Sequence, residues 1–195
     1  LCRPSLMTML TGHYASQHGV TGNDPSPKYA ARNSELYNKR RATLISYIDK
    51  FDTLPELLGK QGYLSHQSGK YWEGNFSRAG FTHGMTRGFP KPGGRHGDDG
   101  LKIGRNGMQS VKEFVDHAVD KEKPFFLWYA PFLPHTPHNP PARLLEKYKK
   151  EGRPITISKY YAMCDWFDET CGQLIDILEK HNLRENTLIA YVTDN

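Results

Sequence analysis

FFLWYA, residues 125–130, is an unbroken apolar run that follows the turn residues Lys123 and Pro124. A strand that is buried on both faces of a parallel sheet has no polar side, so a run of this kind is typical of one. Residues 109–121 precede it with apolar side chains three and four positions apart, a spacing that predicts an amphipathic helix. A helix followed by a buried strand is the unit from which α/β folds are built.

The remainder of the chain repeats this alternation. Segments with the caps and periodicity of helices are residues 4–10, 53–62, 141–150 and 158–181. Segments with strand character are residues 63–68 and 187–192, the second expected to be buried. Residues 21–41 and 71–107 are predicted as loops, and a loop as long as the second is usually functional. The sequence therefore predicts an α/β fold with a mainly parallel sheet.

The composition excludes several classes of protein. The 195 residues are polar, with 37% hydrophobic side chains, but 12% aromatic residues are too many for a disordered chain. No apolar run reaches the roughly 18–20 residues of a membrane helix, so no membrane span is expected. The net charge of +5 is scattered, with no basic stripe between stacking aromatics, so nucleic-acid binding is not expected. Three cysteines make neither a disulfide framework nor a thiolate zinc site.

Several polar residues fall at strand ends or at a helix start. Ligands of parallel sheets gather beyond the carboxyl ends of the strands, and the free N–H groups at a helix start favour an anion. The candidates are Cys2 at the first helix, Lys70 and His135 after two strands, and Asp194 and Asn195 after the last strand.

Four segments resemble motifs of the sulfatase family, in the family's order. CRPSLMTMLTG, residues 2–12, is similar to the signature Cys-x-Pro-Ser-Arg followed by Leu-Thr-Gly. SGKYWEG (68–74) resembles Gly-Lys-Trp-His-x-Gly, PHTP (134–137) resembles Pro-His-x-Pro, and TDN (193–195) resembles Ser/Thr-Asp-Asn. The first motif is specific, and the other three gain weight from standing in register with it.

The resemblance implies an alkaline phosphatase-like fold, in which a mainly parallel sheet is flanked by helices on both faces. It also implies that residues 1–195 are the central part of a single catalytic domain, truncated at both ends. The first metal-binding strand would lie upstream and the C-terminal part downstream. Such a fragment is expected to be inactive alone. Because relatives are often exported, a periplasmic or extracellular location is expected.

The activity that the resemblance implies is hydrolysis of a sulfated carbohydrate or aryl sulfate. A formylglycine-generating maturation enzyme would oxidise Cys2 to formylglycine, whose hydrate is the nucleophile. Lys70 and His135 would bind the sulfate and act in catalysis, with His135 protonating the leaving oxygen. Ca²⁺ or Mg²⁺ would be bound by the modified Cys2 together with Asp194 and Asn195, whose hard oxygen atoms suit these ions.

The sequence departs from the family pattern at two positions. Leu6 stands where the signature has Arg, and Trp72 stands where the family has a second active-site His. Trp72 is predicted either to shape a sugar-stacking, substrate-binding surface or to be a buried aromatic residue. His13, after Leu-Thr-Gly, is expected near the substrate. The pair Asp98-Asp99 is predicted to be a loop turn, because no apolar strand precedes it as the family's metal-binding pair requires.

Two alternative functions stay open at this point. A phosphate ester or phosphonate hydrolase of the same superfamily would use the same charges, and it predicts a preference for phosphate. A non-catalytic relative that binds sulfated glycans is motivated by Leu6 and Trp72. It predicts binding that survives Cys2→Ala, without turnover.

Overall fold

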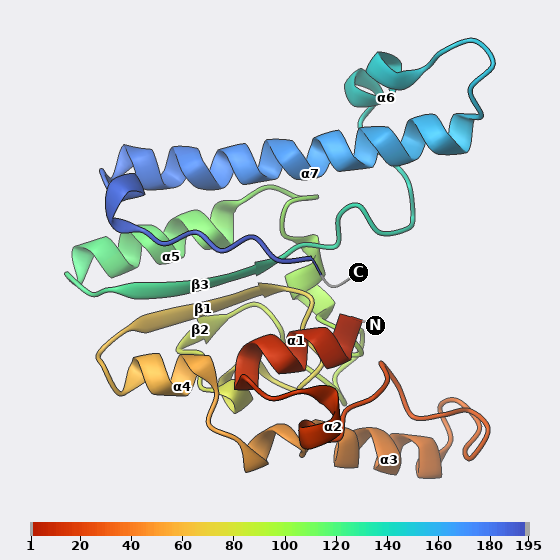
Figure 1. Ribbon diagram of the computed structural model, residues 1–195, viewed down its shortest axis with the longest axis vertical. Coiled ribbons are helices and arrows are strands. Elements are labelled where there is room, and N and C mark those ends of the chain that lie inside the picture. Colours follow the sequence, from red (N-terminus) through yellow and green to blue (C-terminus); the bar gives the residue numbers. More distant parts are fainter. Residues whose placement is uncertain (1, 194–195) are drawn as a thin grey trace.

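The computed structural model describes residues 2–193 and contains a three-stranded parallel sheet between helices (Figure 1). The strand order is β2-β1-β3, with β1 (Leu64–Gly69) in the centre, β2 (His83–Gly84) and β3 (Phe125–Ala130). β1 and β3 pair in register from Leu64 opposite Phe125 to Gly69 opposite Ala130. The α/β fold and the parallel sheet predicted from the sequence are confirmed.

The α-helices of the described chain vary from one turn to seven turns. They are α1 (Cys2–Thr11), α2 (Ala15–His18), α3 (Glu35–Ile45), α4 (Leu54–Gly59), α5 (Gln109–Asp120), α6 (Ala142–Tyr148) and α7 (Ile155–Lys180). Short 3₁₀ turns are η1 (Ile48–Lys50), η2 (Phe76–Ala79), η3 (Asp98–Lys102) and η4 (Arg184–Asn186).

β3 separates two apolar clusters, because successive side chains of a strand point to opposite faces. Phe126 and Trp128 pack with the apolar side of α1. Leu127 and Tyr129 pack with residues of α5 and α7, the helices that lie together on one side of Figure 1. Helices therefore cover both faces of the sheet, which explains why the run has no polar position.

α4 begins where its sequence predicts. The Thr53 hydroxyl accepts a hydrogen bond from the Glu56 backbone N–H, and the Glu56 carboxylate accepts one from the Thr53 N–H. This reciprocal cap satisfies donors that the first turn of a helix leaves unpaired. Thr53 also donates to the Ala79 carbonyl at 2.7 Å, which ties the helix start to η2.

The prediction of a loop over residues 21–41 was wrong at its end, where α3 begins at Glu35. Ser34 caps the helix by accepting a hydrogen bond from the Tyr37 N–H at 3.2 Å. Most of the side chains of α3 are polar, so the sequence shows no apolar stripe there. The helix is therefore invisible to a search for amphipathic periodicity.

The prediction of a buried strand over residues 187–192 was also wrong. This segment has no strand pairing in the described chain, and Leu188 is 95% exposed and Tyr191 74% exposed. An apolar run becomes a buried strand only where neighbours cover both of its faces. Here Val192 and Thr193 instead line a hollow beside α1, with Pro4 and Thr8.

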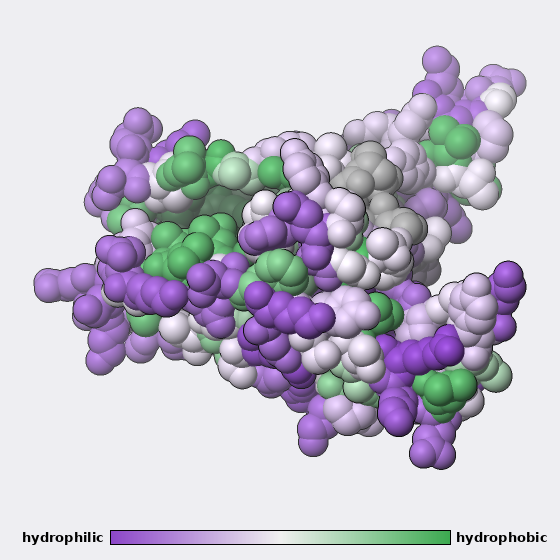
Figure 2. Space-filling model, turned by 60° about the horizontal axis from the view of Figure 1, so that its bottom comes forward, coloured by the Kyte–Doolittle hydropathy of each residue, from purple (hydrophilic) through white to green (hydrophobic). Residues whose placement is uncertain are grey.

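The face in Figure 2 carries hydrophilic side chains in many places, with apolar ones gathered in separate patches. This distribution agrees with the scattered charge of the sequence. Among residues 2–193, no helix combines the length and the apolar character that crossing a membrane requires.

Candidate active site

The site is built around the carboxyl ends of β1 and β3. β1 ends at Gly69, whose φ is +84°, and a Cβ there would lie 1.9 Å from the Ala130 carbonyl oxygen. Only glycine allows so close an approach of two backbones. The next residue, Lys70, donates its backbone N–H to the same oxygen at 2.6 Å. The sheet register therefore places Lys70 at the edge where the loop after β3 begins.

Cys2 and Lys70 are in direct contact. Cys2 is the first residue of α1, and the Lys70 Nζ donates to its Sγ at 3.6 Å. Both side chains are half-buried, so a ligand can reach them. The structure thus joins two residues that lie 68 positions apart in the sequence.

His135 reaches the same place through Phe132. Its ring stacks on Phe132 with centroids 4.4 Å apart, and the Lys70 Nζ lies 5.6 Å from the Phe132 centroid. The His135 Nδ1 lies 2.8 Å from the carbonyl oxygen of Thr136. Phe132 therefore links the predicted catalytic residues His135 and Lys70, and Lys70 in turn contacts Cys2.

A buried ion pair connects the two chain segments that carry Cys2 and Lys70. The Arg3 guanidinium donates two hydrogen bonds to the Glu73 carboxylate, at 2.8 and 2.7 Å. Burial raises the pKa of Glu73, and the hydrogen bonds and charge of Arg3 oppose that rise. The sequence does not predict this pair, because a contact between positions 3 and 73 has no local signal.

His96 is a further residue of this region that sequence analysis missed. Its ring lies 5.3 Å from that of Trp72 and 5.5 Å from that of Phe132, centroid to centroid. Burial, together with the charges of Arg95 and Lys70, lowers the pKa of His96 to about 4. His96 is therefore neutral near pH 7. Its signal in the sequence is its place in the loop 71–107, predicted to be functional.

Two predicted substrate-binding residues are placed differently from expectation. Trp72 is only 5% exposed, so the prediction of a sugar-stacking surface was wrong and the alternative, a buried aromatic residue, is confirmed. His13 follows the C-terminal end of α1, about 14 Å along the axis from Cys2 at 1.5 Å per residue. There it packs on Phe51 with centroids 4.7 Å apart. The structure therefore does not bring His13 to the site.

The predicted metal ligands Asp194 and Asn195 lie outside the described residues. Over residues 2–193, no group of three or more His, Cys, Asp or Glu side chains is placed to hold a metal ion. The Asp98 carboxylate accepts hydrogen bonds from the backbone N–H groups of Arg87 and Gly88, at 3.1 and 2.8 Å. This is the structural turn that the sequence predicts for Asp98.

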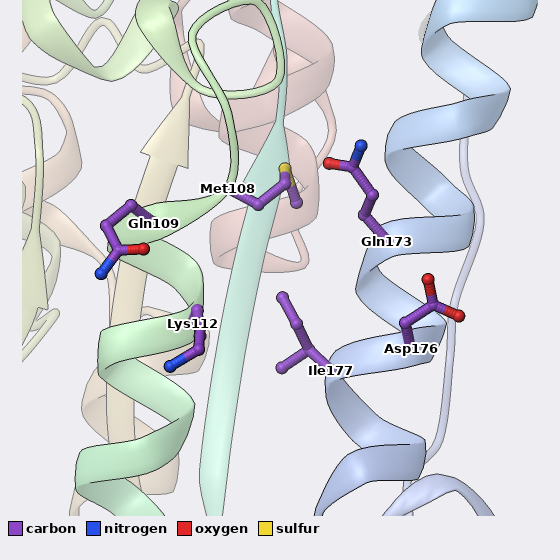
Figure 3. Close-up of a pocket in the computed structure, with 6 residues that line it drawn as sticks. All are labelled: Met108, Gln109, Lys112, Gln173, Asp176 and Ile177. Carbon is purple, nitrogen blue, oxygen red and sulfur yellow. The ribbon is translucent and has the colours of Figure 1, made fainter.

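A groove between α5 and α7 lies away from these residues (Figure 3). Met108 and Ile177 face one another across it, and both belong to the apolar cluster that packs on Leu127. That cluster covers the face of β3 opposite to α1. The groove is therefore not part of the candidate active site.

The sequence is similar to those of known sulfatases. N-acetylgalactosamine-6-sulfatase of Canis lupus familiaris is 23% identical over 229 residues, which cover 100% of this chain and 41% of the relative. The Homo sapiens protein of the same name is 23% identical over 230 residues, with the same coverage. The chain thus spans about two fifths of the length of these relatives.

A solved structure shows a similar fold. Ps i-CgsB in complex with k-i-k-neocarrahexaose has a TM-score of 0.59 at 21% identity, over 92% of this chain and 44% of the other. The family model described as Sulfatase matches residues 1–195, the whole sequence. The chain that brings Cys2, Lys70 and His135 together at one edge of its sheet belongs to the sulfatase family.

Proposed function

We propose that the protein hydrolyses sulfate esters with a nucleophile at Cys2, a cationic anchor at Lys70 and a proton donor at His135. The contact between Lys70 Nζ and Cys2 Sγ supports this most directly, because it puts a positive charge beside the attacking atom. Negative charge develops on oxygen atoms in the transition state, and a fixed cation stabilises it. Family membership supports sulfate as the ester group.

Cys2 is proposed to be converted to formylglycine by a maturation enzyme. When present, the modification supplies a geminal diol, with one hydroxyl to attack sulfur and a second to release sulfate. The position suits an anion, because the unpaired N–H groups of a helix start attract negative charge. Leu6, at the signature Arg position, packs against the apolar cluster of α1. Lys70 is therefore the proposed source of positive charge next to Cys2.

His135 is proposed to donate a proton to the leaving oxygen of the ester. A carbonyl oxygen only accepts hydrogen bonds, so the contact with Thr136 holds the hydrogen on Nδ1 and leaves Nε2 for the substrate. Protonated Nε2 gives its proton to the alcohol oxygen as the bond from that oxygen to sulfur breaks. The balance is one ester and one water consumed, and one alcohol and one sulfate formed.

We also propose that a divalent cation, Ca²⁺ or Mg²⁺, is bound by Asp194 and Asn195. When bound, the cation would supply further positive charge beside the sulfate. The proposal is supported by the neighbouring Thr193, which lines the same hollow as Pro4 near the start of α1. Metal analysis before and after chelation tests it: bound Ca²⁺ or Mg²⁺ is expected in the full-length protein and less in Asp194→Ala.

The substrate class is proposed to be sulfated carbohydrate. Two relatives are named for sulfate on N-acetylgalactosamine, and one similar structure holds k-i-k-neocarrahexaose. Aryl sulfates serve as chromogenic probes of the same chemistry. The proposed location is periplasmic or extracellular, which fractionation of the producing cells tests.

The test combines mass spectrometry and turnover in the full-length protein made with and without a formylglycine-generating enzyme. We expect the aldehyde form of the Cys2 peptide and sulfate release only with that enzyme. Cys2→Ala is expected to lose activity about a thousandfold or more. Cys164→Ala, on α7, is the matched control and is expected to keep it. An unmodified thiol together with no sulfate release would overturn the proposal.

The same assay separates the alternatives. Rates with a sulfate and a phosphate ester of one leaving group are compared, and a phosphate preference would favour the phosphohydrolase. Sulfated-glycan binding by Cys2→Ala with no turnover by the wild type would favour a non-catalytic role. The burial of Trp72 removes the sugar-stacking argument for that role.

A further inference from the structure

The loop that carries His135 cannot hold its own shape by backbone hydrogen bonds. Residues 131–141 contain five prolines, and proline has no N–H to donate. One backbone hydrogen bond, from the Asn139 N–H to the Pro137 carbonyl at 3.1 Å, closes within this stretch. The carbonyl groups of the loop therefore need donors from elsewhere.

Arg105 supplies those donors from the end of the loop 71–107. Its Nε and Nη2 donate to the Phe132 carbonyl at 3.1 and 3.0 Å. Nη2 also donates to the carbonyls of His135 at 2.8 Å and Pro137 at 3.3 Å. Nη1 donates to the Asn139 Oδ1 at 2.5 Å. One guanidinium thus reaches four positions across eight residues of the loop.

The two carbonyls nearest the site belong to residues whose rings form it. Phe132 and His135 are stacked at 4.4 Å, and the Lys70 Nζ lies 5.6 Å from the Phe132 centroid. The guanidinium carbon of Arg105 itself lies 5.7 Å from that centroid. The hydrogen bonds from Arg105 to these two carbonyls therefore fix the position of the His135 ring relative to Lys70.

We propose that Arg105 is a positioning residue, which fixes the His135 loop for proton transfer to the leaving group. The proposal rests on the sulfate-ester hydrolysis proposed above. Arginine suits the task because its planar group offers five donors in a fixed fork. Lysine, with a single ammonium, cannot span the same acceptors.

The test compares Arg105→Met, Arg105→Lys and Arg143→Met in the full-length protein. Arg143 is the matched control, because its guanidinium donates its hydrogen bonds to the Glu169 carboxylate on α7. Hydrogen–deuterium exchange of peptide 131–141 is measured first. We expect faster exchange in Arg105→Met, a smaller increase in Arg105→Lys and no change in Arg143→Met. Unchanged hydrogen–deuterium exchange of this peptide in Arg105→Met overturns the proposal, whatever the turnover of the variant.

Turnover of aryl sulfates with leaving groups of different basicity is measured next. A misplaced proton donor penalises basic leaving groups most, so Arg105→Met is expected to lose at least about tenfold in kcat on these. A smaller loss is expected on acidic leaving groups, with KM within about threefold. An equal loss on all substrates would indicate a merely structural role and overturn the proposal. A wild-type protein without sulfate release contradicts the proposed function instead, and the exchange result still decides whether Arg105 holds the loop.

Discussion

Arg3 and Glu73 form an ion pair in the protein interior, with their side chains 1% and 3% exposed. Arg3 follows Cys2 directly, and Glu73 comes three residues after Lys70. One buried contact therefore ties together the two chain segments that present the proposed nucleophile and its cation.

Glu73→Gln is expected to destabilise the protein by about 3–5 kcal/mol, because it leaves a buried guanidinium without its counter-charge. Unfolding in denaturant measures this cost. Asp49→Asn is the matched control: its bidentate partner Arg78 is 38% exposed, so a loss below about 1 kcal/mol is expected. Equal losses in the two variants would contradict the prediction.

The double variant Arg3→Met with Glu73→Leu is expected to recover much of that stability. Apolar side chains of similar size often replace a buried ion pair at little cost. A double variant as unstable as the sum of both single variants would show that the two side chains do not act as a pair.

Gly69→Ala is expected to abolish the close approach of β1 and the end of β3. The added Cβ would lie 1.9 Å from the Ala130 carbonyl oxygen, so the backbone that places Lys70 must move. Gly12→Ala is the control, because φ is also positive there but no atom lies within 4 Å of the new Cβ. We expect the free energy of unfolding, measured in denaturant, to fall by about 1 kcal/mol in Gly12→Ala. A much larger loss is expected in Gly69→Ala. Similar losses would count against the steric argument.

Stability is expected to fall at acid pH because of His66. Burial lowers the pKa of His66 to about 4, with a further contribution from His83, whereas an unfolded histidine titrates near 6.5. The unfolded chain therefore binds the proton more readily. The stability is fully present above pH 6.5 and is lost as the pH falls toward 4, by about 2–3 kcal/mol. Thermal unfolding of wild type and His66→Gln between pH 7 and 4.5 measures this, and an equally steep decline in both would contradict it.

His96 is expected to stay neutral from pH 8 down to about pH 5. NMR titration of the histidine rings, assigned with His96→Asn, measures this. Because the Lys70 charge helps to lower the pKa of His96, Lys70→Met is expected to raise it. A midpoint near 6.5 in the wild type would contradict the burial argument.

Parts of the fold that depend on local patterns were predictable. The apolar run of β3 and the periodicity of α5 appear in the structure where the sequence indicates. α3 was missed because a mostly polar helix leaves no stripe, and Ser34 was its main signal. Residues 187–192 were misjudged because an apolar run does not reveal whether neighbours cover it.

Some residues of the candidate site could be predicted from the sequence, and others could not. Cys2, Lys70 and His135 lie in recognisable motifs, and the structure brings them together. His96 and Arg105 belong to a loop without a repeating pattern, and their contacts are made with residues far along the chain. Such tertiary contacts carry no spacing signal, so only the three-dimensional structure reveals them.

The two-sided packing of β3 has a consequence for how this protein can change over time. Side chains of Phe126 and Trp128 meet the helix that begins with Cys2, whereas Leu127 and Tyr129 meet α7. The strand therefore separates the face of α7 that packs on Leu127 from the helix that begins with Cys2. Over evolution, Leu174 and Ile177 on that face of α7 are therefore expected to tolerate more substitution than the side chains that pack between β3 and α1.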